Sequence, residues 1–204
     1  MDKHLVFLVW IAAAYFVGAI PFGYLIGRMR GVDVRTVGSK NIGATNVYRT
    51  VGHAWGFLAF FCDFLKGLVP TLLACLYASR HSDGGALIVH LPVCVGLACV
   101  VGHTLTVFMR FKGGKGVATA FGMMIALAPY PTLAAFGVFA VTVWLSHYIS
   151  LGSILAAVTL GTLVWFVDCL PLLRGIATAI AVFVIVKHRS NIVRLVNGCE
   201  NKIY

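Results

Sequence analysis

Charged residues are scarce in this chain of 204 residues, and acidic residues are the scarcest. Only 11% of the residues are charged, with six Asp and Glu against sixteen Lys and Arg. The polar segments rich in Lys and Arg contain only Asp33 and Glu200, too few carboxylates to hold Mg²⁺. This argues against metal-dependent phosphatases and CDP-alcohol phosphotransferases, and we expect no metal and no other cofactor.

Several familiar patterns are also missing. No two cysteines have the C-x-x-C spacing, and the six cysteines lie mostly inside apolar runs, so we expect neither a disulfide framework nor a zinc site. No histidine is followed five residues later by aspartate, which removes the His-x4-Asp arrangement of common glycerolipid acyltransferases. The ten-residue alternation of a membrane β-barrel is absent too.

Apolar residues dominate what remains: 60% of the chain is hydrophobic and the mean hydropathy is +0.95. Leu5–Ile26 has no charged residue over 22 positions, enough for a helix to cross roughly 30 Å of hydrocarbon. We predict one domain, residues 1–204, of the all-α integral membrane class, a bundle of seven transmembrane helices. The predicted runs are Leu5–Ile26, Ala54–Ser79, Ala86–Met109, Val117–Tyr130, Thr132–Tyr148, Leu151–Val167 and Leu170–Val186.

The fourth run, Val117–Tyr130, is short. Its fourteen residues reach only about 21 Å as a helix, so a full span requires local thinning of the bilayer or extra residues from the loop before it. Both a full span and a re-entrant segment are consistent with this length.

Positive charge is distributed unevenly. Segments 28–53, 110–116 and 187–204 hold twelve of the sixteen Lys and Arg. The positive-inside rule places all three in the cytoplasm, with the N-terminus outside and the C-terminus cytoplasmic. The net charge of +10 could also suggest nucleic acid, but membrane orientation, anionic membrane lipid and anionic substrates account for it, so we predict no nucleic-acid partner.

The central polar motif is the basic glycine turn, Arg110-Phe111-Lys112-Gly113-Gly114-Lys115-Gly116. Glycine lets backbone N–H groups approach a ligand closely, and adjacent cations favour a dense anion such as phosphate. It is not a Walker motif, because Met109 stands where the first glycine should be and Gly116 follows Lys115, so nucleotide hydrolysis is disfavoured. The alternative is a basic turn that only orients the protein.

A second candidate loop runs from Gly38 to Arg49. Its hydroxyl, amide and guanidinium groups could bind an oxyanion, although the same residue types are common in capped interfacial or re-entrant turns. The candidate phosphate-binding residues here are Ser39, Asn41, Thr45, Asn46 and Arg49.

A third candidate region is the basic tail. His188 and Asn191 are three residues apart and would share a face if the last helix continued through them. His188 is the best general-base candidate, because histidine titrates near neutral pH. The alternative is a basic helix end held by anionic lipid.

Two ionisable sites inside predicted spans are interpreted as structural. Asp63 and Lys66 lie three apart and are expected to form a pair that holds the first loop, with direct substrate contact by Lys66 as the alternative. His103 lies close to the basic glycine turn and is expected to be packed and hydrogen-bonded.

The ordered polar blocks together resemble the acyl-phosphate-dependent glycerol-3-phosphate acyltransferases of bacteria, often called PlsY. The resemblance covers nearly the whole chain. The blocks that carry it are Gly38 to Arg49, Asp63 to Gly67, Gly102 to Thr119, Tyr148 to Ser153, and His188 to Ile192 with Glu200-Asn201.

The resemblance implies a multi-pass enzyme of the bacterial cytoplasmic (inner) membrane with its active site on the cytoplasmic face. Such an enzyme moves a fatty acyl group from acyl phosphate to the 1-hydroxyl of sn-glycerol 3-phosphate. The products are lysophosphatidic acid and phosphate, in the first committed acylation of phospholipid synthesis. The family uses neither acyl-CoA nor acyl carrier protein directly and is not known to need a metal. A soluble supplier of acyl phosphate is a candidate partner.

The resemblance also assigns roles. Ser39 and Arg49 come from its first block, the glycines and lysines of the basic glycine turn from its second, and His188 with Asn191 from its third. Glu200 is more structural than chemical in the family. We hypothesise that one phosphate binds Lys112, Lys115 and the N–H groups of Gly113, Gly114 and Gly116, while Ser39 and Arg49 hold another, with Ser150 as a further contact.

Either phosphate could lie at either loop, and the attacking hydroxyl could lose its proton to His188 or to a substrate phosphate. Thr106, His147 and Ser190 depart from the family's usual proline, arginine and acidic residue. His147 weakens the case for an extra cation near Ser150. The competing functions are an organic-phosphate transporter of the inner membrane and a non-catalytic scaffold.

Overall fold

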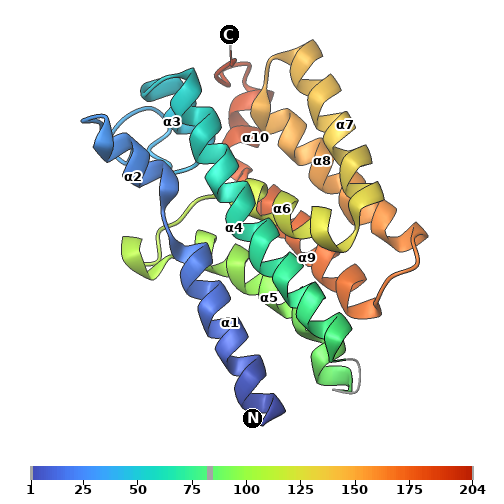
Figure 1. Cartoon of the computed structure of the whole chain (residues 1–204). Helices are drawn as coiled ribbons and strands as arrows, with labels where there is room; N and C mark the ends of the chain where they lie inside the picture. The colour runs from blue at the N-terminus through green and yellow to red at the C-terminus, as the bar shows by residue number, and fades with distance from the viewer. Residues whose placement is uncertain (1, 82–84, 204) are drawn as a thin grey trace. The chain divides into compact units, whose positions relative to one another are not determined.

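The computed structural model describes residues 2–81 and 85–203, and all regular elements in these ranges are helices (Figure 1). The chain divides into two compact units, Met1–Leu127 and Ala128–Tyr204. The first contains α1 (Lys3–Ala19), α2 (Phe22–Met29), α3 (Ala44–Thr50), α4 (His53–Arg80), α5 (Ala86–Thr104), the 3-10 turn η2 (Val107–Met109) and α6 (Val117–Leu127). The second contains α7 (Pro129–Ser146), α8 (Ile149–Leu163), η3 (Val164–Phe166), α9 (Pro171–Lys187) and α10 (Arg189–Val196).

The first predicted helix is broken. α1 ends at Ala19, Ile20 leaves the helical conformation (φ −58°, ψ 118°), and α2 starts after Pro21. Proline has no N–H to continue the helical ladder, and its ring disfavours helical geometry at the residue before it. The break leaves the carbonyl of Ile20 available to another partner, which is described below.

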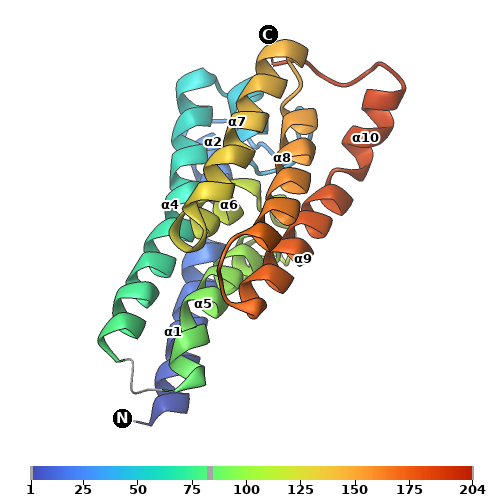
Figure 2. The ribbon, with the colours of Figure 1, turned by 90° about the vertical axis from the view of Figure 1, so that its right-hand side faces the viewer.

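Glycines bring helix backbones of the first unit into direct contact. α1 packs along α5, and α4 along α6 (Figure 2). A Cβ on Gly18 would collide with the carbonyl of Cys99, and one on Gly67 with the carbonyl of Thr119. Small residues at such contacts are typical of membrane helices, which associate through close packing because lipid is as apolar as their side chains.

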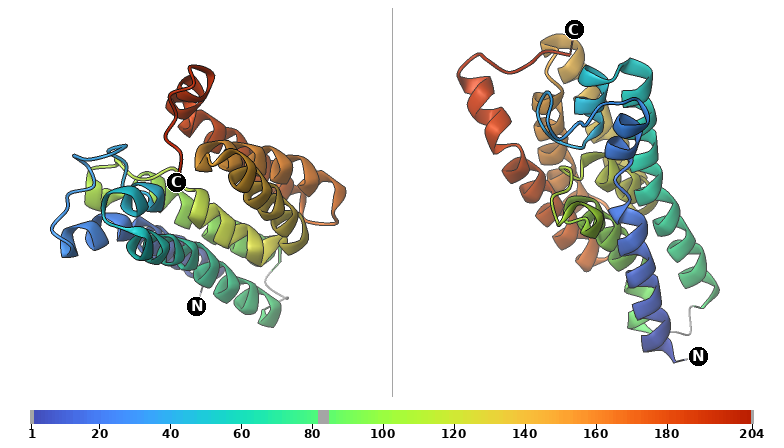
Figure 3. Two further views of the ribbon diagram at one scale, coloured as in Figure 1. Left: turned by 90° about the horizontal axis from the view of Figure 1, so that it is seen from above. Right: turned by 90° about the vertical axis from the view of Figure 1, so that its left-hand side faces the viewer.

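Proline also separates the two units' helices along the chain. α6 ends at Leu127, and α7 begins at Pro129, a position where proline fits because the first helical N–H has no partner within the helix. In the second unit, α8 packs against both α7 and α9, as Figure 3 shows from two sides.

Five helical segments of the described chain are long and apolar enough to cross a membrane, and a sixth counts if α9 and α10, bent by 55°, form one span. The five are Lys3–Met29, His53–Arg80, Ala86–Met109, Pro129–Ser146 and Ile149–Phe166. The all-helical membrane class is therefore confirmed. α6 is an apolar helix of 11 residues, shorter than a standard span. The count of seven spans and the orientation of the termini stay predictions.

Candidate functional site

Asn46 organises the loop from Gly38 to Arg49. Its side chain is buried, its Oδ1 accepts a hydrogen bond from the N–H of Ser39 (2.9 Å), and its Nδ2 donates to the carbonyl of Val34 (2.8 Å). A second donation from Nδ2 reaches the carbonyl of Val37 (3.2 Å). The amide of Asn46 therefore serves to fold the loop, and its contact with a phosphate stays a prediction.

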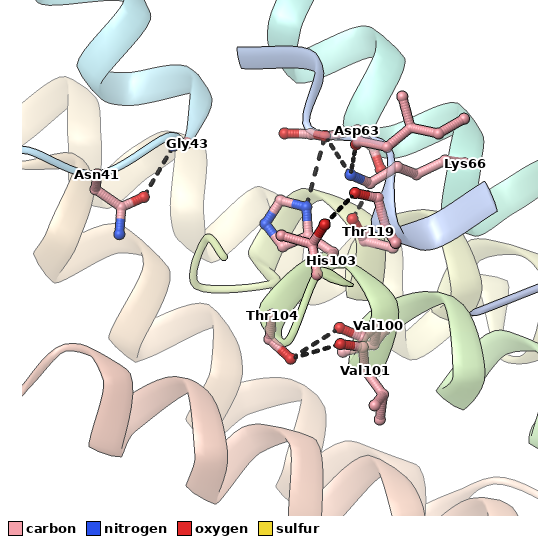
Figure 4. Close-up of polar contacts among 12 residues, drawn as sticks. Asn41, Gly43, Asp63, Lys66, Val100, Val101, His103, Thr104 and Thr119 are labelled. Atoms are coloured by element: carbon pink, nitrogen blue, oxygen red, sulfur yellow. Dashed lines mark hydrogen bonds and ion pairs between the residues drawn. The ribbon is translucent and has the colours of Figure 1, made fainter. Parts of the chain in front are cut away.

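The remaining candidates of this loop are more accessible. Ser39 is exposed, while Thr45 and Arg49 on α3 are half-buried. The Oδ1 of Asn41 accepts a hydrogen bond from the N–H of Gly43 (2.8 Å; Figure 4), so its carbonyl side shapes the turn into α3. The loop thus presents the hydroxyl of Ser39 at its surface, and the guanidinium of Arg49 lies on α3.

Asp63 and Lys66 form a buried ion pair on α4, as predicted. The Nζ of Lys66 lies 2.7 Å from the Oδ1 of Asp63, and both side chains are almost fully buried (Figure 4). The same ammonium donates to the carbonyl of Ile20 (2.8 Å), the group exposed by the break between α1 and α2. The pair therefore holds the start of the first polar segment through one backbone contact.

His103 on α5 joins this pair. Its Nδ1 lies 3.5 Å from the Oδ1 of Asp63, and its side chain is buried (Figure 4). The hydroxyl of Thr119 on α6 donates to the backbone carbonyl of Asp63 (3.0 Å). The predicted packing of His103 is thus confirmed, although its Nδ1 has no hydrogen-bond partner among the described residues, and the cluster connects α4, α5 and α6.

The basic glycine turn folds back onto the end of α5. The N–H of Gly113 donates to the carbonyl of Thr104 (3.1 Å), and the N–H of Gly114 donates to the carbonyl of His103 (3.2 Å). These two N–H groups therefore have partners within the chain, and the hypothesis that they hold a phosphate stays a prediction. Gly116 has φ +82°, a left-handed conformation that favours glycine.

The cations of the turn differ in exposure. Arg110 and Lys112 are exposed and Lys115 is half-buried. Because the N–H groups of Gly113 and Gly114 are bonded within the chain, the side chains of Lys112 and Lys115 are the more accessible candidates for anion binding at this turn.

Glu200 gathers the polar groups of the second unit. Its Oε1 accepts hydrogen bonds from the Oγ of Ser150 (2.9 Å) and the Nδ2 of Asn191 (2.7 Å), and its Oε2 from the Nε of Arg194 (2.7 Å). Burial alone would raise the pKa of Glu200, but the hydrogen bonds from Asn191, Arg194 and Ser150 outweigh it and hold this pKa below its ordinary value.

This arrangement is consistent with the supporting role predicted for Glu200. Ser150 is buried and donates to this carboxylate, so it has a structural partner, and its phosphate contact stays a prediction. Arg194 was not among the predicted site residues. Its position three residues after Asn191 on α10 could have indicated a shared partner.

His188 occupies the junction of α9 and α10. The two helices are bent by 55°, so the condition under which His188 and Asn191 would share a face, a helix that continues through both, is not met. His188 is buried, and its Nδ1 lies 2.7 Å from the carbonyl of Val184. A carbonyl only accepts, so Nδ1 donates to it, and in the neutral ring Nε2 would then be the basic nitrogen.

The predicted site residues thus fall into two sets. The first unit brings together Asp63, Lys66, His103, Gly113 and Gly114, and separately Ser39 with Asn46. The second unit brings together Ser150, Asn191 and Glu200. No group of three or more His, Cys, Asp or Glu side chains arranged to hold a metal occurs among residues 2–81 and 85–203.

Comparison with known proteins gives one consistent result. Residues 8–198 match the family described as glycerol-3-phosphate acyltransferase. The chain is 49% identical to a glycerol-3-phosphate acyltransferase of Trichlorobacter lovleyi and 48% identical to one of Geobacter sulfurreducens, over 96% of both chains in each case.

Solved structures agree. A crystal structure of PlsY (YgiH), an integral membrane glycerol 3-phosphate acyltransferase in its glycerol 3-phosphate form, matches with a TM-score of 0.87 and 38% identity. The match covers 97% of this chain and 95% of that one. A second structure, described as the lysophosphatidic acid form, matches with a TM-score of 0.82. This chain belongs to the glycerol-3-phosphate acyltransferase family.

Proposed function

We infer that this protein transfers a fatty acyl group from acyl phosphate to the 1-hydroxyl of sn-glycerol 3-phosphate. The observation that carries the inference is the likeness over 97% of the chain to an enzyme solved in a glycerol 3-phosphate form and a lysophosphatidic acid form. Acyl phosphate as donor is supported by the site's composition, because cations and hydroxyls suit two phosphate-bearing substrates.

The two phosphates are assigned to two loops. Lys112 and Lys115 of the basic glycine turn would hold one phosphate as point charges, and Ser39 with Arg49 would hold the other by hydroxyl and guanidinium. Thr45, one turn before Arg49 on α3, is the supporting contact of the second group. Binding both phosphates would place the hydroxyl beside the acyl carbon, which lowers the entropic cost of the bimolecular reaction.

Acyl transfer then needs one displacement. The 1-oxygen of glycerol 3-phosphate bonds to the acyl carbon, and the bond between that carbon and the phosphate oxygen breaks. Phosphate leaves with the electron pair, and the cations that hold it stabilise its charge. The hydroxyl proton must go to a base, and His188 and a substrate phosphate oxygen are the two candidates.

The membrane arrangement follows from the helix lengths and charges. We propose seven spans: the six of suitable length, with α9 and α10 taken as one, and the short α6. The N-terminus would lie outside and the three basic segments in the cytoplasm of a bacterium's inner membrane. The acyl chain would lie in the inner leaflet, between helices.

A phosphate-release assay separates this enzyme from a transporter. Purified protein should release inorganic phosphate from acyl phosphate only when glycerol 3-phosphate is present, with one lysophosphatidic acid formed per phosphate. Flux of glycerol 3-phosphate into sealed vesicles without any acyl donor, and no such release, would instead support an organic-phosphate transporter.

A further inference from the structure

The buried Asp63–Lys66 pair has a titratable neighbour, His103, that charge balance does not require. Lys66 alone neutralises Asp63 at 2.7 Å. Yet the ring of His103 also faces the same Oδ1, at 3.5 Å, from a different helix. All three residues are at most 5% exposed. His103 therefore lies in an enclosed polar cluster although the charge of Asp63 is already neutralised by Lys66.

The opposite side of the His103 ring supports the basic glycine turn. A Cβ on Gly114 would collide with the Nε2 of His103, and one on Gly113 would collide with the carbonyl of His103. The N–H of Gly114 also donates to that carbonyl (3.2 Å). The side chain and the backbone carbonyl of His103 thus both pack against the turn and determine its position. The contacts are close enough to require glycine at 113 and 114.

We propose that Asp63 and His103 are positioning residues for phosphate binding by Lys112 and Lys115. The carboxylate of Asp63 lies 3.5 Å from Nδ1 and attracts a proton on that nitrogen, an electrostatic contact that biases the ring's orientation although no hydrogen bond joins the two atoms. The ring then supports Gly114, and the turn on either side carries the two lysines. Neither Asp63 nor His103 needs to touch a substrate in this arrangement.

The inference deepens the proposed function and rests on it, because the turn matters only if it binds a substrate phosphate. A displacement of the lysines by even 1 Å would weaken a phosphate contact strongly, whereas the reaction at the acyl carbon would change less once substrate is bound. A positioning role therefore predicts a higher KM for the substrate held at this turn, with a smaller change in kcat.

The test uses His103→Asn in the purified full-length protein. Asparagine keeps an N–H donor near Asp63 but removes the ring beneath Gly114. We expect the KM for one of the two substrates, glycerol 3-phosphate or acyl phosphate, to rise about tenfold or more. The KM for the other substrate should change less than threefold, and Tm should remain within a few degrees of wild type.

Two further variants make the result decisive. Gly114→Ala displaces the turn from the ring while leaving Asp63, Lys66 and His103 intact, and should raise the KM for the same substrate. His90→Asn is the matched control, because His90 is a half-buried histidine near the other end of α5. It should leave both KM values unchanged.

Each outcome has one meaning. Wild-type KM values for both substrates in either variant would overturn the inference, as would failure of both variants to fold while His90→Asn folds, since the residues would then serve the fold alone. An inactive wild-type protein would instead contradict the proposed function, so the two failures are distinguishable.

Discussion

The Oγ of Ser150 donates a 2.9 Å hydrogen bond to Glu200, fifty positions further along the chain. The tail is held a second time where the N–H of Ile203 donates to the carbonyl of His147 (2.9 Å). His147 ends α7 in the left-handed conformation (φ +63°), which turns its carbonyl away from the helix. The tail after α10 is therefore fixed to the start of α8 by a carboxylate.

Stability of the second unit should depend on the charge of Glu200. The pKa of Glu200 is lowered in the folded protein from its ordinary 4.5, so its contribution is complete above that value and is lost as pH falls through the lower folded pKa. We expect the Tm of wild type to fall more than that of Glu200→Gln between about pH 5 and about pH 3. Parallel curves for the two proteins would contradict this.

Removal of the buried ammonium of Lys66 should strongly destabilise the folded protein. Lys66→Met leaves the carboxylate of Asp63 buried without its cation, and breaking such pairs typically costs about 3–5 kcal/mol. We expect a large loss of Tm or of folded protein. Asp63→Leu combined with Lys66→Met removes both charges and should recover much of the loss. A single variant as stable as wild type would rule out this account of the pair.

The glycine contact between α4 and α6 should tolerate no side chain. Gly67→Ala places a methyl group against the backbone of Thr119, and overpacking of this kind typically costs about 1–3 kcal/mol. Gly137→Ala is the control, because nothing lies within 4 Å of the added Cβ on α7. We expect thermal unfolding to show a lower Tm for the first variant and an equal or higher Tm for the second. The reverse order would be incompatible with the packing described.

The role of His188 can be separated from its packing. His188→Asn retains a donor for the carbonyl of Val184 but has no basic Nε2. If His188 takes the proton, kcat should fall about a hundredfold or more, while Tm and both KM values change little. Wild-type kcat in this variant would remove His188 as the base and leave proton transfer to a substrate phosphate.

Helix positions were largely predictable from the sequence, because long apolar runs bounded by glycine, proline and charged residues leave few alternatives. The predicted third run, Ala86–Met109, matches its observed bounds. The break at Pro21 was missed, because it lies inside an apolar run whose composition does not change there. The predicted seventh run ended at Val186, one residue before α9 ends at Lys187.

Site chemistry was predictable only as residue type. Asn46, Ser150, Gly113 and Gly114 were all predicted to contact a ligand, and each has a hydrogen-bond partner within the chain. An amide, a hydroxyl or a backbone N–H serves equally well for a fold or a ligand, so spacing alone could not distinguish the two uses. The ion pair of Asp63 and Lys66 was predictable, because two opposite charges inside an apolar helix are stabilised by pairing with one another.

Acyl transfer by the purified protein tests the central claim most directly. Acyl phosphate and acyl-CoA should be compared as donors to glycerol 3-phosphate, each with a metal chelator present, with lysophosphatidic acid measured as product. The account predicts product from acyl phosphate at an undiminished rate and none from acyl-CoA. Product from acyl-CoA alone, or loss of activity with the chelator, would contradict it.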